Sequence, residues 1–303
     1  MKGTVFLVNP AAGSGKAAAV WQALLDSHPE LRAATVVHDA DRAVASGLLA
    51  GSLGDGARSL IVLGGDGTLH HAANALLAGG FASRVALGVV PAGTGSDLAH
   101  TLGIPDSPGA ALQLALEAEP RPVDAIEVTR EGRPTTYVVN TASAGVSGVV
   151  VDAVNRLARR SSATYLAATL RALAGYRGLR CRVAVDGESW YEGPILLLAV
   201  ANGASFGKGM RVAPRARVDD GLADVVLVDD VPRWHLPLRL AQLYLGRHLG
   251  ARPVRFRQAR RVHFEPLEPF PSFELDGDAS PAAAAELRVL PGALRVLRPA
   301  GPR

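Results

Sequence analysis

The residues best suited to chemistry form the run Gly-Gly-Asp-Gly-Thr at positions 64–68, which directly follows the apolar residues 60–63. Glycines permit a tight turn and close approach of a ligand to the backbone. Thr68 can cap a helix that begins near Leu69, and a helix N-terminus favours a phosphate through its N–H groups and dipole. A plain strand–helix turn would need one glycine, so Gly64, Gly65 and Gly67 together favour a phosphate site around Asp66.

Two further glycine loops follow predicted strands. Residues 9–16 read Asn-Pro-Ala-Ala-Gly-Ser-Gly-Lys after the strand at 4–8, and residues 91–97 read Pro-Ala-Gly-Thr-Gly-Ser-Asp after the strand at 85–90. The first loop is no P-loop, because Pro10 lies five positions before Gly15 and Ala17 replaces the magnesium-binding Ser or Thr. We interpret it as a second phosphate-facing loop.

The elements that must position these loops alternate between strands and helices up to about residue 120. This order predicts a doubly wound parallel sheet with ligands at the carboxyl ends of the strands. From about Pro120 the pattern changes to short alternating strands, which predict a second, mainly antiparallel β domain. These strands are expected at residues 125–129, 135–140, 180–185, 195–201, 223–228, 254–257, 261–264 and 272–275, with one more at 293–298. One helix, over residues 149–177, interrupts this second pattern.

Composition limits the remaining possibilities. The chain has 303 residues, a formal net charge of +4 and a sequence pI near 9.6. A mild basic excess permits anionic partners without naming one. The single Cys181 excludes an intramolecular disulfide and a thiolate zinc cluster. The apolar run at residues 195–200 is too short to span a membrane, so we expect any membrane contact to be peripheral.

Residues 153–185 contain several arginines and no acidic residue. The arginines of the predicted helix are Arg156, Arg159, Arg160, Arg171 and Arg177. A solvated helix face and a basic face that binds an anionic membrane explain them equally well.

Taken together and in order, these motifs resemble the diacylglycerol kinase catalytic-domain family, which includes bacterial lipid kinases and is similar to sphingosine and ceramide kinases. The motifs that carry the resemblance are the loops at 9–16, 64–68 and 91–97, followed by Ala-Asn-Gly at 201–203, Gly-Met-Arg-Val-Ala-Pro at 209–214, Asp-Asp-Gly-Leu at 219–222 and Asp-Gly-Asp at 276–278. The resemblance implies an NAD-kinase-like α/β nucleotide domain at 1–124, to which residues 291–303 return. It also implies a β-sandwich-like lipid- and metal-binding domain at 125–290.

The resemblance also implies roles for individual residues. It assigns ATP to Asn9, Pro10, Ala11, Ala12 and Gly13, to Gly64, Gly65, Gly67 and Thr68, and to Gly93 and Thr94. It assigns Mg²⁺ to Asp220 and the backbone oxygens of Arg217 and Leu222, with Asp124 coupled through water. Oxygen ligands suit such a hard cation, although residues 219–221 alone would indicate a plain turn.

Asp97 is expected where the lipid headgroup approaches, or alternatively as a helix N-cap. The candidates for the carboxylate near the acceptor hydroxyl are Asp66, Asp276 and Asp278. Asp276 and Gly277 could instead form a type I′ hairpin turn.

The sequence departs from the family pattern at a few positions. His70 and His71 replace Asn-Glu, Ser96 replaces Asn, Asp278 replaces Glu, and His38 occupies a position often held by Thr. Adjacent helical residues do not face one another, so we expect one of the two histidines to face solvent and the other the nucleotide.

The sequence therefore predicts an ATP- and Mg²⁺-dependent kinase, cytoplasmic and peripheral at the membrane, that phosphorylates a hydroxyl of diacylglycerol or a related lipid. We expect no nucleic-acid partner and no transmembrane segment, and a homodimer is left open. The alternatives are a non-catalytic nucleotide-binding regulator and an NAD-kinase-like enzyme with a soluble substrate.

Overall fold

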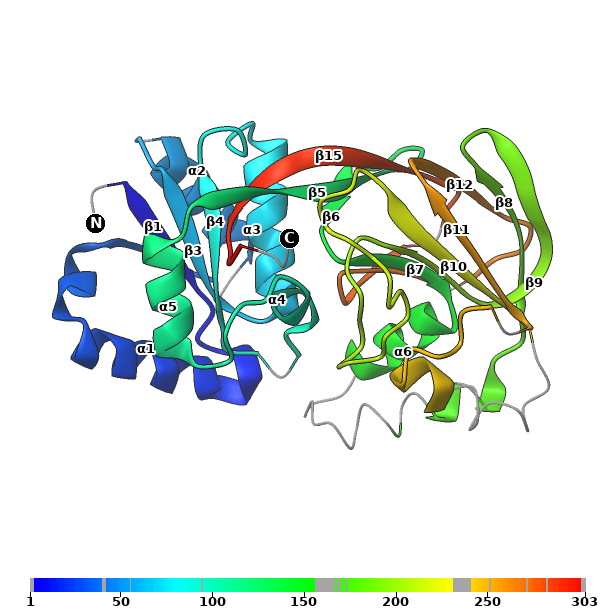
Figure 1. The fold of residues 1–303 in the computed structure, drawn as a ribbon, viewed down its shortest axis with the longest axis horizontal. Coiled ribbons are helices and arrows are strands. Elements are labelled where there is room, and N and C mark those ends of the chain that lie inside the picture. Colours follow the sequence, from blue (N-terminus) through cyan, green and yellow to red (C-terminus); the bar gives the residue numbers. More distant parts are fainter. Residues whose placement is uncertain are drawn as a thin grey trace. The chain divides into compact units, whose positions relative to one another are not determined.

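The structure is a computed structural model that describes most of the chain (Figure 1). The described residues are 3–39, 42–54, 56–93, 95–155, 167, 170–172, 174–230, 241–250, 252–270, 272–281 and 283–300. Contacts divide the chain into two compact units, one comprising Met1–Asp124 with Pro291–Arg303 and the other Ala125–Leu290.

The first unit is built on a parallel sheet. Its strands lie in the order β2-β1-β3-β4, and the end of β15 pairs in parallel with β4 through Val296 and Leu87. The strand bounds are β1 Thr4–Val8, β2 Thr35–His38, β3 Ser59–Gly64, β4 Ala86–Pro91 and β15 Ala285–Leu297. The helices are α1 Lys16–Ser27, α2 Arg42–Gly54, α3 Asp66–Ala78, α4 Asp97–Thr101 and α5 Pro108–Glu117, with short 3₁₀ turns at Ala12–Gly15 and Pro29–Ala33. The predicted doubly wound parallel sheet is confirmed.

The central strand β3 shows why this sequence gives such a sheet. Leu60, Ile61, Val62 and Leu63 are all at most 1% exposed. A parallel strand with helices on both sides buries both of its faces, so it needs a continuous apolar run rather than alternation.

The second unit is an antiparallel β structure in which the helix α6, Val146–Asn155, directly follows β7. The long strand β9 pairs along its first half with β8 and along its second half with β7 and β10. The strands are β5 Pro120–Thr129, which enters from the first unit, β6 Thr136–Val138, β7 Thr141–Gly145, β8 Leu179–Val185, β9 Glu188–Ala201, β10 Ala223–Asp229, β11 Val254–Ala259, β12 Arg261–Pro266, β13 Ser272–Leu275 and β14 Asp278–Pro281.

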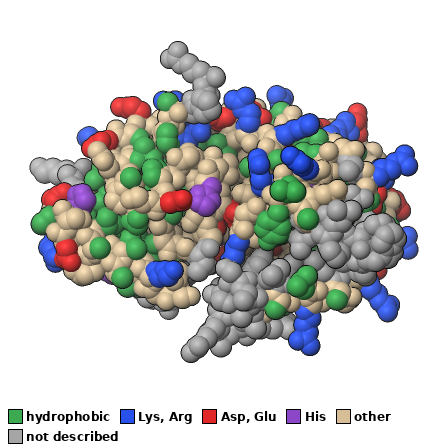
Figure 2. Space-filling model, turned by 60° about the horizontal axis from the view of Figure 1, so that its bottom comes forward, with side chains coloured by type: hydrophobic (Ala, Val, Ile, Leu, Met, Phe, Trp, Pro, Cys, Tyr) green, Lys and Arg blue, Asp and Glu red, His purple; other side chains and the backbone are tan. Residues whose placement is uncertain are grey.

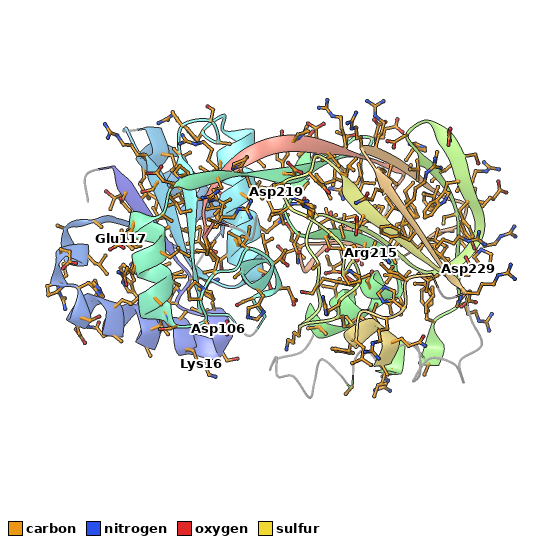
Figure 3. All side chains as sticks on the ribbon, in the orientation of Figure 1. Lys16, Asp106, Glu117, Arg215, Asp219 and Asp229 are labelled. Carbon is orange, nitrogen blue, oxygen red and sulfur yellow. The ribbon has the colours of Figure 1, made fainter. Side chains whose placement is uncertain are left out.

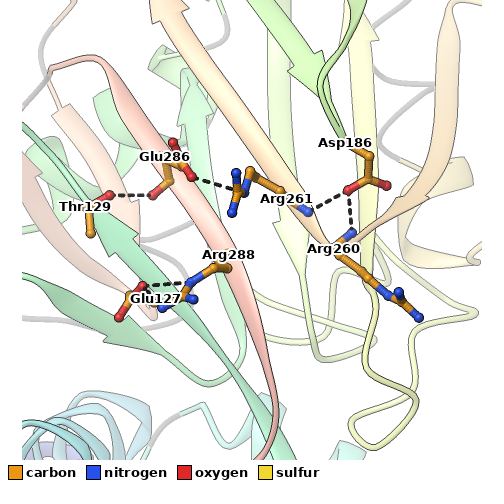
Figure 4. A network of polar contacts seen from close by, with 7 residues as sticks. All are labelled: Glu127, Thr129, Asp186, Arg260, Arg261, Glu286 and Arg288. Atoms are coloured by element: carbon orange, nitrogen blue, oxygen red, sulfur yellow. Dashed lines mark hydrogen bonds and ion pairs between the residues drawn. The ribbon is translucent and has the colours of Figure 1, made fainter.

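Exposed ion pairs connect strands of the second unit (Figure 4). Arg288 lies 2.8 Å from Glu127, and Arg261 lies 3.1 Å from Glu286. Asp186 accepts hydrogen bonds from the backbone N–H groups of Arg260 and Arg261. Each exposed ion pair contributes at most about 1 kcal/mol to the stability of the fold. We therefore interpret the network as contacts that help to fix the register of neighbouring strands, and not as a functional site.

The predicted helix at 149–177 is confirmed in part, because residues 149–155 and the described residues 167, 170–172, 174 and 175 are helical. The helix α6 begins at Val146 and is described to Asn155, while Arg156, Arg159 and Arg160 lie outside the described residues. Tyr176, near the end of the predicted helix, is buried in the core, where its hydroxyl accepts a hydrogen bond from Leu179 N–H and donates to the Ile195 carbonyl. Among the described helices, none is long and apolar enough to cross a membrane.

Candidate phosphate-binding site

The three glycine loops meet at the carboxyl ends of β1, β3 and β4. The backbone N–H of Asn9 donates to the Leu63 carbonyl at 3.0 Å, which joins the first loop to β3 directly before the second loop. Ala92 N–H donates to the Gly64 carbonyl at 2.9 Å, which joins the third loop to the second. Parallel registers that align Val8 with Leu63 and Gly64 with Pro91 produce this meeting point.

Close backbone approach explains why these positions are glycines. A Cβ on Gly13 would lie 2.5 Å from the Ala92 carbonyl oxygen, and Gly13 also has a positive φ of 61°. A Cβ on Gly93 would lie 2.6 Å from the Gly65 Cα. Both distances are too short for a real Cβ, so side chains at these two positions would push the loops apart.

The side chain of Asn9 links two of the loops. Its Nδ2 donates to Thr68 Oγ1 at 3.0 Å, and its Oδ1 accepts from Ala11 N–H at 3.1 Å. The sequence placed Asn9 in the site but did not predict its bond to Thr68, which is 59 residues away.

The helix α3 begins earlier than predicted, at Asp66. Gly65 is its N-cap in an extended conformation, so Thr68 lies inside the first turn and is not the cap. Asp66 is consequently the first residue of the helix, where a carboxylate interacts favourably with the helix dipole. The N-terminus of α3 thus lies where the three loops meet.

Other predicted residues of this site have varied surroundings. Thr94 lies outside the described residues. Pro10, Ala12 and Gly13 are partly exposed and Ala11 is exposed, as a surface that contacts a ligand requires. Lys16, labelled in Figure 3, is exposed at the start of α1.

Asp97 is only 4% exposed and is the first residue of α4, while Ser96 occupies the N-cap position. The alternative that Asp97 is the N-cap is therefore wrong. Its expected role at the lipid headgroup stays a prediction.

The adjacent histidines differ from the expectation that one faces solvent. His70 is buried, and its Nε2 lies 3.3 Å from the Asn74 amide. The His71 ring is only 10% exposed, with Nδ1 3.2 Å from Asp39 Oδ1 and Nε2 2.8 Å from Ser46 Oγ. Both rings are held by protein groups because Asp39, Ser46 and Asn74 come within hydrogen-bond distance of them.

In the second unit, Asp276 and Gly277 form the two-residue turn between β13 and β14. Both have positive φ, 50° and 87°, as a type I′ turn requires. The carboxylate of Asp276 is also buried and accepts backbone hydrogen bonds from three consecutive residues at 2.9–3.0 Å. These donors are the N–H groups of Val139, Asn140 and Thr141. Such an arrangement favours a structural role for Asp276.

Asp278 differs from Asp276 in its surroundings. It is the first residue of β14, pairs with Leu275 across the hairpin and is partly exposed. Of the two carboxylates, Asp278 is the one that a substrate could reach.

The predicted cation site lies in the loop before β10 (Figure 3). Asp220 Oδ1 accepts from Leu222 N–H at 3.0 Å, and Asp219 lies 3.6 Å from Arg217. This is the turn geometry that the short sequence indicates. Within the described residues, no cluster of three or more His, Cys, Asp or Glu side chains is arranged for a metal.

A neighbouring carboxylate makes the loop more suitable for a cation. Asp224 is 2% exposed, and its Oδ2 has no hydrogen-bond partner among the described residues, while Oδ1 accepts from Gln258. Burial, with a smaller contribution from the charge of Asp220, raises the pKa of Asp224 to about 6. Asp224 was not predicted from the sequence, although an acid inside the apolar run 223–228 was a visible signal. The oxygen-rich loop fits a hard cation.

Asp124 belongs to the first unit, whereas Arg217, Asp220 and Leu222 belong to the second. Asp124 is 2% exposed and accepts a hydrogen bond from Gly292 N–H at 2.7 Å. This bond connects the middle of β5 to the returning strand β15. The expected coupling of Asp124 to the cation stays a prediction.

Comparison with known proteins identifies the family. Residues 3–128 match the diacylglycerol kinase catalytic domain, and residues 140–298 match the YegS C-terminal NAD kinase beta sandwich-like domain. A diacylglycerol kinase from Mycobacterium tuberculosis is 30% identical over 254 residues, which are 83% of this chain and 80% of that protein. The chain belongs to the diacylglycerol kinase family of lipid kinases.

A second relative agrees with the family assignment, and a solved structure has the same fold. A Pseudomonas aeruginosa protein named "Probable lipid kinase YegS-like" is 33% identical over 87% of this chain and 82% of its own length. The crystal structure of a diacylglycerol kinase from Bacillus anthracis shares the fold, with a TM-score of 0.75 at 22% identity, covering 98% of this chain and 96% of that one. The predicted resemblance and the predicted NAD-kinase-like and β-sandwich-like fold are confirmed.

Proposed function

We propose that this protein is an ATP-dependent lipid kinase that transfers the γ-phosphoryl group to a hydroxyl of diacylglycerol or a related lipid. The observation that carries the proposal is the meeting of three glycine loops around the N-terminus of α3. Backbone N–H groups and a helix dipole at one point suit a polyphosphate. The names of the relatives, diacylglycerol kinase and lipid kinase, support a lipid as the acceptor.

Phosphoryl transfer asks the protein mainly to align the reactants and to stabilise charge on the phosphate. In this proposal the tight contacts of Gly13, Gly65 and Gly93 keep side chains away from the phosphates. Asn9 holds the Thr68 hydroxyl in a fixed position. Asp66, at the start of α3, is the carboxylate proposed to accept the proton of the lipid hydroxyl, with Asp278 as the second candidate.

The loop at residues 217–222 is proposed to hold Mg²⁺ through the Asp220 carboxylate and the Arg217 and Leu222 carbonyls. When bound, the ion would supply positive charge that compensates Asp220 and Asp224. In this proposal the role of the ion is structural.

A lipid acceptor also requires access to a bilayer. We propose peripheral attachment through basic residues, although Arg156, Arg159 and Arg160, which are expected to provide it, lie outside the described residues. Lys and Arg side chains are scattered over the face shown in Figure 2, between acidic and apolar ones, so that view favours no single basic patch.

The acceptor can be tested by incubating the protein with radiolabelled γ-phosphate ATP and Mg²⁺ in three parallel reactions. They contain short-chain diacylglycerol in mixed micelles, a total lipid extract, and NAD. Label in the lipid fraction of the first two is expected. Label in NAD alone would support the soluble-substrate kinase, and ATP binding without any transfer would support the regulator.

A further inference from the structure

We propose that Ser46, His71 and Asp39 form an activated-serine site at which Ser46 is covalently modified by electrophilic phosphoryl compounds. Ser46 lies on α2, His71 on α3, and Asp39 immediately follows β2. Ser46 Oγ is 2.8 Å from His71 Nε2, and His71 Nδ1 is 3.2 Å from Asp39 Oδ1. A hydroxyl, an imidazole and a carboxylate joined in this order are the arrangement that activates a serine nucleophile.

The neighbouring carboxylate determines which tautomer the neutral imidazole adopts. A carboxylate can only accept a hydrogen bond, so Asp39 selects the tautomer with its proton on Nδ1. The other nitrogen, Nε2, then has its lone pair directed at Ser46 Oγ and can take the hydroxyl proton. The Asp39 side chain is only 1% exposed. Its hydrogen bond to the imidazole is strengthened by this burial, because the local dielectric constant is low.

Solvent exposure increases from Asp39 through His71 to Ser46, so a reagent can reach the serine while the acid stays buried. The Asp39 side chain is buried and the His71 ring is nearly so, whereas Ser46 is exposed and open to a small molecule. The Asp39 backbone N–H donates to the Val8 carbonyl at 2.8 Å, so the acid is fixed to the edge of the parallel sheet. None of the three residues belongs to the proposed phosphate loops, and the inference does not depend on lipid kinase activity.

The chemical step can be written for a fluorophosphonate, the probe that we would use. Ser46 Oγ attacks phosphorus and an O–P bond forms while the P–F bond breaks. Fluoride leaves with the bonding electrons, and the hydroxyl proton passes to His71 Nε2. The phosphonylated Ser46 is the stable product.

The chain contains a matched control. Ser27 Oγ lies 3.0 Å from His28 Nδ1 on an exposed surface, but within the described part of the chain His28 has no carboxylate partner. Ser27 also donates to the Ala23 carbonyl at 2.8 Å. This pair has the serine and the imidazole without the acid.

The experiment measures the labelling rate of each serine in the full-length protein by peptide mass spectrometry, without nucleotide or lipid. Because a general base contributes about 100-fold or more, Ser46 should react at least about 100-fold faster than Ser27. His71→Gln should abolish most of this advantage, and Asp39→Asn should lower the rate by at least about tenfold. Melting temperature reports whether each variant is folded, and His71→Gln provides the decisive comparison if Asp39→Asn melts early.

Equal labelling of Ser46 and Ser27 would overturn the proposal. So would a Ser46 rate that is the same in the wild type and in folded His71→Gln. In either case the three residues would be a hydrogen-bonded link between α2, α3 and β2 without reactivity.

Discussion

Gly93 and Gly65 bring the backbones of two loops so close together that no side chain fits between them. We predict that Gly93→Ala raises the KM for ATP by about tenfold or more, because its Cβ would lie 2.6 Å from the Gly65 Cα and separate the loops. Steady-state kinetics over a range of ATP concentrations measure this effect.

A glycine with open space around it provides the control for this substitution. Gly109 lies in α5, and a Cβ added there would meet no atom within 4 Å, so Gly109→Ala should leave the KM unchanged. It should also stabilise the helix by about 0.5–1 kcal/mol. An unchanged KM in Gly93→Ala would show that the contact between the loops does not shape the ATP site.

The sequence predicted the three glycine loops of the proposed phosphate site but not the bonds that hold their side chains. The glycines at 13, 65 and 93 could be predicted because runs of glycine directly after apolar strands are typical of phosphate loops. The bonds from Asn9 to Thr68 and from His71 to Asp39 join residues 59 and 32 positions apart. Such pairs depend on how the strands are ordered in the sheet, which local patterns do not specify.

At the scale of elements, strands with strong apolar patterns were predicted best. The bounds of β1 and β13 are those expected from sequence, at residues 4–8 and 272–275. The strand β7, Thr-Ala-Ser-Ala-Gly, was missed because its small residues lack β-branched alternation, although all five are buried. The strand β9 begins at Glu188 rather than at the expected Ile195, because its first half is largely exposed and polar.

The hairpin β13–β14 allows the two carboxylates around Gly277 to be separated by substitution. We predict that Asp276→Ala lowers the free energy of unfolding by about 3 kcal/mol or more, since it removes the acceptor of three backbone N–H groups. Chemical denaturation monitored by circular dichroism measures this loss.

The matched variant Asp278→Ala should leave stability within about 0.5 kcal/mol, because Asp278 is partly exposed. If Asp278 takes part in transfer, this variant loses turnover while remaining folded. A stable Asp276→Ala protein would contradict the structural role that we assign to Asp276.

The loop before β10 gives a prediction about the cation. We expect Mg²⁺ to raise the melting temperature of the wild type and not that of Asp220→Ala, because an ion that binds only the folded state stabilises it. A thermal melt at several Mg²⁺ concentrations measures this. If Mg²⁺ does not change the melting temperature of the wild type, residues 219–221 form a plain turn without a bound ion.

At the scale of the whole molecule, the proposed lipid substrate leads to a prediction about binding to a membrane surface. Three arginines, each contributing about 1 kcal/mol near an anionic surface, would supply roughly 3 kcal/mol of attraction. We predict that changing Arg156, Arg159 and Arg160 to Gln weakens sedimentation with anionic vesicles and raises the apparent KM for vesicle-presented lipid. Activity on detergent-solubilised lipid should change little.

Salt dependence provides the control, because surface attraction is screened within a Debye length. Vesicle binding that is equal for variant and wild type, or that does not decrease with added salt, would contradict the prediction. These arginines would then belong to an ordinary solvated surface.

Phosphoryl transfer to a lipid is proposed to take place at the glycine loops, with Asp66 at the start of α3 as the proton acceptor. The most direct test of this claim measures transfer of radiolabelled γ-phosphate from ATP to short-chain diacylglycerol by the wild type and by Asp66→Asn, which keeps the size of the side chain. We predict transfer by the wild type and a loss of more than about tenfold in the variant, equivalent to at least about 1.4 kcal/mol of barrier, at an unchanged melting temperature. A folded Asp66→Asn protein that retains more than about a tenth of the wild-type rate would contradict the claim.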